Sequence, residues 1–219
     1  MSPTWVQAAF DAAHGGGAFS GVCRELRNPF DADSPVLNPS GTFHNAFGTA
    51  FRTCNAAVHA SLLRDVGGFD ESLGRYGHED SELCTRLTKA GFPIGPAPDM
   101  LVYFRETTQR RAQLRKVWMQ ANAEYVYWAR HPDRFASMLQ TPLHVHQVVG
   151  LVPWYVQQVR HRQPIRWEAA GRDAVTRVGR LRAALRWSRA GSVPPSILLD
   201  QAIDNIVRRP RRDAPTPGR

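Results

Sequence analysis

Apolar residues follow two patterns along this chain, and the change falls near residue 105. Before that point, short apolar stretches bounded by turn-forming residues predict three strands, at Phe19–Leu26, Phe47–Thr53 and Met100–Phe104. Helical spacing in the same part predicts three short helices: Pro3–Ala13, Asn55–Val66 and Ser81–Ala90. After it, apolar residues recur every three or four positions, which predicts four further helices: Thr108–Arg130, Leu143–Arg162, Arg166–Arg189 and Ser196–Arg209. An α/β part therefore precedes an all-helical part.

Local signals support several of these boundaries. Ser2 and Pro3 form a typical N-cap and first helical residue. Gly67 and Gly68 are expected to end the second helix, one of them in the left-handed conformation. Repeated Asn, Pro and Gly residues predict a loop over Asn28–Asn45.

The two parts also differ in charge, within a total of +9. Up to Phe104 the sequence has 7 Lys and Arg against 11 Asp and Glu, and from Arg105 onward it has 21 against 8. A basic half fits a negatively charged partner: a membrane surface, a nucleic acid or a phosphorylated ligand. An Arg-rich helical face that is merely solvated fits the same pattern.

The sequence also indicates where in the cell the protein is located. The chain has no uninterrupted run of about 18 apolar residues, and its N-terminus lacks the basic start and apolar centre of a signal peptide. Cys23, Cys54 and Cys84 are odd in number and lack metal-ligand spacing, which indicates reduced thiols. We therefore expect a cytoplasmic protein, with peripheral contact to the inner face of the plasma membrane through its basic helices as one option.

Candidate chemistry gathers between Cys54 and Asp80, where a helix, a double-glycine stop and an acidic turn lead into the pair Glu79-Asp80. A carboxylate in the first turn of a helix stays ionised and can take the proton of an attacking hydroxyl. The helix dipole also weakens such a base, so burial would have to offset it. The alternative is that Asp80 is only an N-cap.

Three segments carry a resemblance to a known family: Thr53–Ala57, Gly67–Glu71 and Gly77–Leu83. Their order and spacing resemble the family 2 inverting glycosyltransferases of the GT-A fold, especially a galactosyltransferase-like C-terminal segment, over Phe47–Arg105. The later basic helices resemble the tail of actinobacterial-type members. The resemblance implies an α/β fold, with a partial GT-A domain over residues 1–106. A helical, basic extension would follow over 107–209, and 210–219 would be a disordered tail.

The resemblance also implies substrates and roles. The donor would be a nucleotide-sugar and the acceptor a glycan or lipid-linked hydroxyl. Asp80 would be the general base, and Glu79 would orient the acceptor next to His78. Asn55 would lie near the donor sugar or shape the pocket wall, and Arg105 would approach the donor diphosphate.

Asp70 is a further substrate-binding candidate, although capping its own turn is the stronger interpretation of that residue.

The chain departs from the family pattern in the motif that binds a metal ion. Such enzymes hold a divalent ion, Mg or Mn, through an Asp-x-Asp motif in a nucleotide-binding half. Here Met1–Trp5 resembles the helix that follows that motif, so we expect an N-terminally truncated enzyme whose metal ligands lie outside the chain. Asp31-Ala32-Asp33 follows a loop instead of a buried strand, and we interpret it as turn chemistry. Tyr103 and Phe104 stand where a metal-ligating His would be expected.

Three hypotheses remain from the sequence. The chain is part of a glycosyltransferase, or a non-catalytic partner subunit without a donor site, or a basic module for nucleic acid. The helix at Arg166–Arg189 carries one apolar stripe among its arginines: Trp167, Gly171, Ala174, Val178, Leu181 and Leu185. That stripe either packs on the rest of the protein or lies in an anionic membrane interface.

Overall fold

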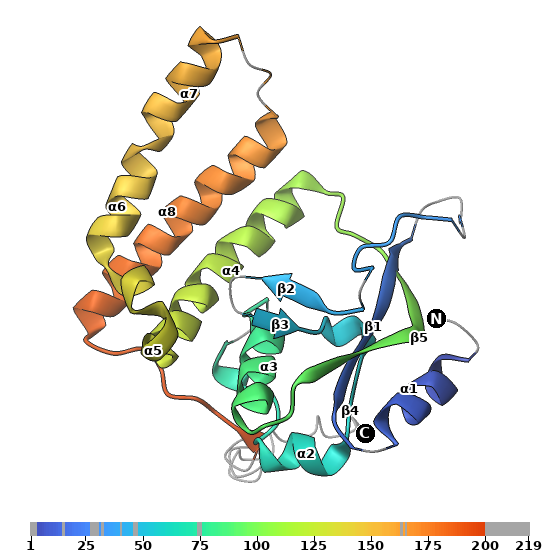
Figure 1. Cartoon of the computed structure of the whole chain (residues 1–219). Coiled ribbons are helices and arrows are strands. Elements are labelled where there is room, and N and C mark those ends of the chain that lie inside the picture. Colours follow the sequence, from blue (N-terminus) through green and yellow to red (C-terminus); the bar gives the residue numbers. More distant parts are fainter. Residues whose placement is uncertain are drawn as a thin grey trace, which may run out of the picture.

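The computed structural model describes residues 4–14, 16–26, 31, 33–39, 41–45, 48–73, 76–162, 164 and 166–199. Figure 1 shows a small sheet with short helices at one side of the molecule and a group of long helices at the other. This is the arrangement expected from the sequence, an α/β part followed by a helical region.

The central strand of the sheet is β1 (Ala18–Glu25), in the order β4-β1-β5. It pairs in parallel with β5 (Ile94–Phe104) and antiparallel with β4 (Ala56–Val58). A second sheet is the hairpin of β2 (Phe43–Asn45) and β3 (Gly48–Ala50). The register between β1 and β5 shifts after Gly21, where a Cβ would lie 2.3 Å from the Met100 carbonyl oxygen, so only glycine fits.

Three helices accompany the sheets: α1 (Trp5–Ala13), α2 (Ala60–Asp65) and α3 (Glu79–Lys89). The apolar face of α3 forms the core of this part, because Leu83, Cys84 and Leu87 pack with Phe51 and Ile94. Burying this face fixes the N-terminal end of α3 against the loop that follows β3.

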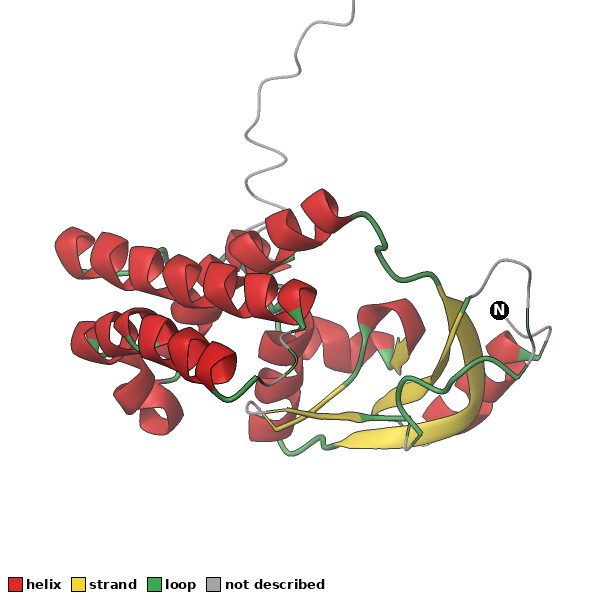
Figure 2. Cartoon of the chain, turned by 90° about the horizontal axis from the view of Figure 1, so that it is seen from above, coloured by secondary structure: helices red, strands yellow, loops and turns green. Residues whose placement is uncertain are grey.

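The helical region begins with α4 (Arg110–Arg130) and continues through α5 (Pro132–Phe135), α6 (Thr141–Val149), α7 (Leu151–Arg160) and α8 (Trp167–Ala190). Seen from above, these helices lie to one side of the sheet (Figure 2). α4 and α8 pack directly on each other around small residues, and Tyr127, Trp128 and Phe135 complete their core.

The apolar stripe predicted along α8 is not its main packing face. The buried residues of the helix are Ala170, Gly179, Ala183 and Ala184, whereas Trp167 is 65% and Val178 43% exposed. Small residues are buried because α8 approaches α4 closely: a Cβ on Gly179 would lie 2.7 Å from the Ala121 Cβ.

Several predicted elements have other bounds in the structure. The predicted helix Asn55–Val66 is a 3-10 turn (Thr53–Asn55), then β4, and only then α2, because Ala56–Val58 forms the edge pairing with β1. The strand expected at Phe47–Thr53 is confirmed only over β3, and the one expected from Met100 begins at Ile94.

The helical part shows two further differences. The single helix predicted at Leu143–Arg162 is divided into two helices in the structure, because α6 ends before Gly150 and α7 begins after it. Of the helix expected at Ser196–Arg209, residues 196–198 are not helical, and the residues from 200 onward lie outside the described part, as do Ser2 and Pro3 and the tail 210–219.

Candidate active site

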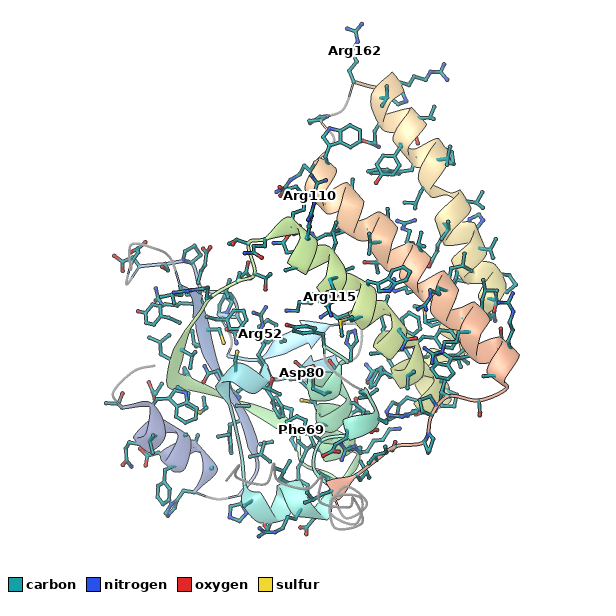
Figure 3. The ribbon with its side chains drawn as sticks, turned by 180° about the vertical axis from the view of Figure 1, so that it is seen from behind. Arg52, Phe69, Asp80, Arg110, Arg115 and Arg162 are labelled. Atoms are coloured by element: carbon teal, nitrogen blue, oxygen red, sulfur yellow. The ribbon has the colours of Figure 1, made fainter. Side chains whose placement is uncertain are left out.

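A cleft of about 530 Å³ lies where the α/β part meets the helical region. Its walls come from the loop after β3, the start of α3, the end of β5, one face of α4, and Arg172 of α8. Arg52 and Asp80 point toward this space below α4 in Figure 3. The cleft therefore joins residues from both parts of the sequence.

An unusual turn leads into α3. Tyr76 and His78 both have left-handed backbone conformations, with φ of 61° and 59°. Such values are uncommon in residues other than glycine, and they concentrate at functional sites. The Gly77 amide donates a hydrogen bond to Glu79 Oε2 at 2.9 Å, which holds that carboxylate over the turn.

Asp80 is not the N-cap of α3. That position belongs to His78, so Asp80 is the second residue of the helix, and its Oδ1 accepts a hydrogen bond from the Ser81 amide at 2.7 Å. Burial raises the pKa of the Asp80 carboxyl, and the charge of Glu79 adds to this, although the Ser81 amide and His78 act in the opposite direction. Burial thus offsets the stabilisation of the charged form by the helix end.

Basic side chains line the same cleft. Arg52 lies with its Cζ 4.1 Å from the centroid of the Phe43 ring and 5.7 Å from that of Phe104. Lys116 of α4 lies with its Nζ 5.4 Å from the ring centroid of Tyr76. Together with Arg172, these cations give the cleft a surface for an anionic ligand in addition to its carboxylates.

Comparison with known proteins covers the same region. Residues 42–109 match the family described as the N-terminal domain of galactosyltransferase. The pre-mycofactocin glycosyltransferases of two Mycobacterium tuberculosis strains, CDC 1551 / Oshkosh and ATCC 25618 / H37Rv, are 35% identical over 80 residues, which cover 36% of this chain and 17% of each relative. We refer to residues 42–109 as the glycosyltransferase segment, because they match this family. The chain spans less than a fifth of the length of these relatives, and no solved structure matches it.

The match falls on the region where the sequence resembles glycosyltransferases, Phe47–Arg105, although the family description names an N-terminal domain where we expected a C-terminal one. Of the residues predicted for its site, the structure brings His78, Glu79 and Asp80 together on the cleft wall. Three others do not line the cleft: Asn55, Asp70 and Arg105.

Asn55 is completely buried. Its Nδ2 donates to the carbonyl oxygens of Val22 at 2.8 Å and Met100 at 2.9 Å, and its Oδ1 accepts from Trp5 Nε1 at 2.7 Å. In this structure Asn55 therefore shapes the wall from behind and does not reach the cleft surface.

Asp70 is also withdrawn from the cleft. Its Oδ1 accepts hydrogen bonds from the amides of Ser72 and Ile197, each at 3.0 Å, and its Oδ2 pairs with Arg130. The carboxylate fixes its own turn and ties it to α4. Arg105 is exposed beyond the end of β5, between two cleft residues, Phe104 and Glu106.

Sequence reasoning missed the basic residues of the cleft. Arg52 directly precedes the Thr53–Ala57 segment, and that position could have drawn attention to it. Lys116 and Arg172 carry no local signal, because helix packing alone brings them to the cleft.

The described residues do not fit a metal ion. Within them, no group of three His, Cys, Asp or Glu side chains could hold one. Asp31 Oδ1 accepts a hydrogen bond from the Asp33 amide at 2.9 Å, which confirms the interpretation of these two residues as turn chemistry.

Proposed function

We propose that the cleft of this chain belongs to an inverting glycosyltransferase, which transfers a sugar from a nucleotide-sugar to an acceptor hydroxyl with Asp80 as the general base. The observation that carries the proposal is the position of Asp80 in the cleft with a raised pKa, within a glycosyltransferase segment. A carboxylate with a raised pKa is a better proton acceptor near neutral pH.

The proposed reaction is a single displacement. The Asp80 carboxylate takes the proton of an acceptor hydroxyl while the hydroxyl oxygen attacks the anomeric carbon of the donor sugar. The bond from that carbon to the nucleotide diphosphate breaks on the opposite face, so the configuration inverts. Glu79, held by the Gly77 amide, orients the acceptor beside His78.

The basic wall of the cleft is suited to the leaving group. Arg52, Lys116 and Arg172 would bind the donor diphosphate and offset the charge that develops as it leaves. Arg105, exposed at the end of β5, would contact the diphosphate only after its side chain moves toward the cleft.

The relatives suggest which acceptor to test first. By name they glycosylate pre-mycofactocin, so that molecule is the first candidate, and a lipid-linked glycan is the second. The donor would be a nucleotide-sugar, chosen from a panel because the cleft lining does not select among sugars.

The test is release of nucleoside diphosphate by the full chain with each donor and acceptor. Asp80→Asn is expected to lower kcat by about 10²–10⁴-fold with little change in the KM for the donor. Asp133→Asn, with an exposed carboxylate outside the cleft, is the matched control and should keep full activity. Full activity in Asp80→Asn would contradict the proposal.

Donor binding separates this proposal from a non-catalytic partner subunit without a donor site. In calorimetric titrations, a nucleotide-sugar should bind the wild-type chain and Asp80→Asn equally. Replacing Arg52 or Lys116 by Ala should weaken that binding. Absence of donor binding to the wild-type chain would favour the partner subunit instead.

A further inference from the structure

The helices farthest from the sheet carry a row of exposed valines. Val145 and Val149 of α6 and Val152, Val156 and Val159 of α7 are each between 43% and 68% exposed. They recur at alternating intervals of four and three residues, so they share one face along both helices. We refer to these five residues as the valine stripe.

The other face of the same helices packs on the protein. His144 and Leu151 are buried, and the Tyr155 hydroxyl donates to the Ala170 carbonyl oxygen of α8 at 3.0 Å. Figure 1 shows α6 and α7 as the outer layer, with α8 between them and α4. Anchoring α6 and α7 on α8 therefore leaves the valine stripe in solvent.

Positive charge gathers where α7 ends and α8 begins. Arg160, Arg162 and Arg166 are all exposed there, and Arg162 projects from the apex of the molecule in Figure 3. From residue 144 to residue 172 the sequence has four arginines and a single acidic residue, Glu168. An apolar stripe next to a strongly basic end is complementary to an anionic lipid surface.

Two exposed tryptophans lie in the same region. Trp154 of α7 is 46% exposed and Trp167 at the start of α8 is 65% exposed. Tryptophan is favoured at the boundary between headgroups and acyl chains, since its ring is apolar and its N–H is polar. None of the helices within the described residues combines the length and hydropathy that crossing a bilayer requires.

We propose that the valine stripe docks on an anionic lipid bilayer, with α6 and α7 lying in the plane of the interface. The valines insert between the headgroups, and the arginines at the apex bind lipid phosphates. The sequence suggested a membrane contact for the apolar stripe of α8, and the proposal assigns that contact to the outer face of α6 and α7 instead. It is independent of the glycosyltransferase chemistry proposed above.

The charges favour lipid over the other occupants of such a face. A second copy packed in parallel along the valine stripe would bring the two sets of Arg160 and Arg162 together, which costs electrostatic energy. A nucleic acid would satisfy the arginines and leave the valine stripe in water. An anionic bilayer satisfies both.

The test is co-sedimentation of the full chain with phosphatidylcholine vesicles, with and without phosphatidylglycerol. The wild-type chain should bind the anionic vesicles more tightly. The pair Arg160→Gln and Arg162→Gln should weaken that binding about 25-fold, about fivefold per arginine. The pair Val149→Ser and Val156→Ser should weaken it by about tenfold or more, because two inserted side chains are lost.

Matched controls come from the opposite end of the molecule. Val6→Ser on α1 removes a valine that is 69% exposed, and Arg64→Gln on α2 removes an exposed arginine; both should bind vesicles like wild type. Circular dichroism checks that all variants are folded. Equal binding to both vesicle types, or valine variants that bind like the controls, would overturn the proposal.

Two further measurements address the other occupants. A wild-type dimer that the valine variants convert to monomer in sedimentation velocity would assign the stripe to a second copy and overturn the lipid proposal. Single-stranded DNA that displaces the chain from vesicles, with no effect of the valine variants on vesicle binding, would overturn it in favour of nucleic acid.

Discussion

The Arg130 guanidinium forms an ion pair with the Asp70 carboxylate, whose side chain is completely inaccessible to solvent. Asp70 belongs to the turn after α2 and Arg130 is the last residue of α4. The guanidinium also donates to Ser72 Oγ at 2.6 Å and to the Pro194 carbonyl oxygen at 2.8 Å. This pair therefore connects the glycosyltransferase segment, the end of α4 and the segment after α8.

Removing Arg130 should be strongly destabilising. Arg130→Ala leaves the Asp70 carboxylate buried without its counter-ion, which typically costs about 3–5 kcal/mol in the free energy of unfolding. The double variant with Asp70→Asn should recover part of that loss, since no uncompensated charge remains. Urea unfolding of the two single variants and the double variant measures the coupling.

The matched control is an ion pair on the surface. Lys89 and Asp133 are 3.5 Å apart, and their side chains are 54% and 65% exposed. Lys89→Ala should change the free energy of unfolding by less than about 1 kcal/mol. A similar small effect of Arg130→Ala would show that the Asp70 pair does not join the two parts.

Asp80 should reduce stability at neutral pH. Its pKa in the folded protein is raised above the ordinary value of 3.8, mainly by burial. The folded state then binds more protons than the unfolded state, so stability falls as pH rises from 3.8 through the folded pKa. Asp80→Asn should therefore be more stable than wild type at pH 7, and the difference should disappear below pH 3.8.

Thermal unfolding of both proteins across this pH range is the measurement. A less stable Asp80→Asn at pH 7 would mean that the charge at the start of α3 stabilises the helix, and that Asp80 serves the fold instead of chemistry. A gain in stability on losing the carboxylate is the pattern expected of a functional group.

How far the sequence could predict the site depends on the range of the interactions. His78, Glu79 and Asp80 were placed together because their turn and helix start are encoded locally. The sequence left two positions open for Asn55, near the donor sugar or in the pocket wall, because its burial depends on pairing of β1 with β5. That long-range pairing decides whether the Asn55 side chain faces the cleft or binds the backbone carbonyl groups behind the cleft wall.

The fold shows the same limit. Long helices were predicted well, since their spacing repeats over many residues, as in α4 and α8. The sequence predicts helix where the edge strand β4 lies, because its Ala-rich sequence has no strand preference of its own and only the contact with β1 extends it. The small residues that let α8 approach α4 were likewise not predicted to be buried, because the stripe that includes Trp167, Val178 and Leu181 gives the stronger apolar pattern.

The close approach of α4 and α8 can be tested with two glycines of the same helix. Gly179→Ala would place a methyl group 2.7 Å from the Ala121 Cβ, and we expect a loss of about 1–3 kcal/mol from overpacking. At Gly171 no atom lies within 4 Å of an added Cβ, so Gly171→Ala should stabilise the helix by about 0.5–1 kcal/mol. Urea unfolding distinguishes the two. Equal effects would contradict the packing of α4 on α8.

Cys54 lines the cleft and its thiol interacts with the buried thiol of Cys23, and this interaction should be visible in a titration. It is the main cause that lowers the pKa of Cys23 to about 7, against the effect of burial, and it raises the pKa of Cys54. Burial raises the pKa of Cys84 to about 12. Thiolate ultraviolet absorbance should therefore show one ionisation near pH 7 in the wild-type protein.

Removing the donor should move that ionisation. In Cys54→Ala the Cys23 thiolate loses its interaction with the Cys54 thiol, so the pKa of Cys23 should rise and the absorbance step near pH 7 should shift to higher pH. Cys84→Ala is the control, because Cys84 remains a thiol near pH 7. In this variant the absorbance step of Cys23 should stay near pH 7. A wild-type protein without any step near pH 7, or a Cys54→Ala variant whose step does not move, would mean that the two thiols do not share a proton at the cleft wall.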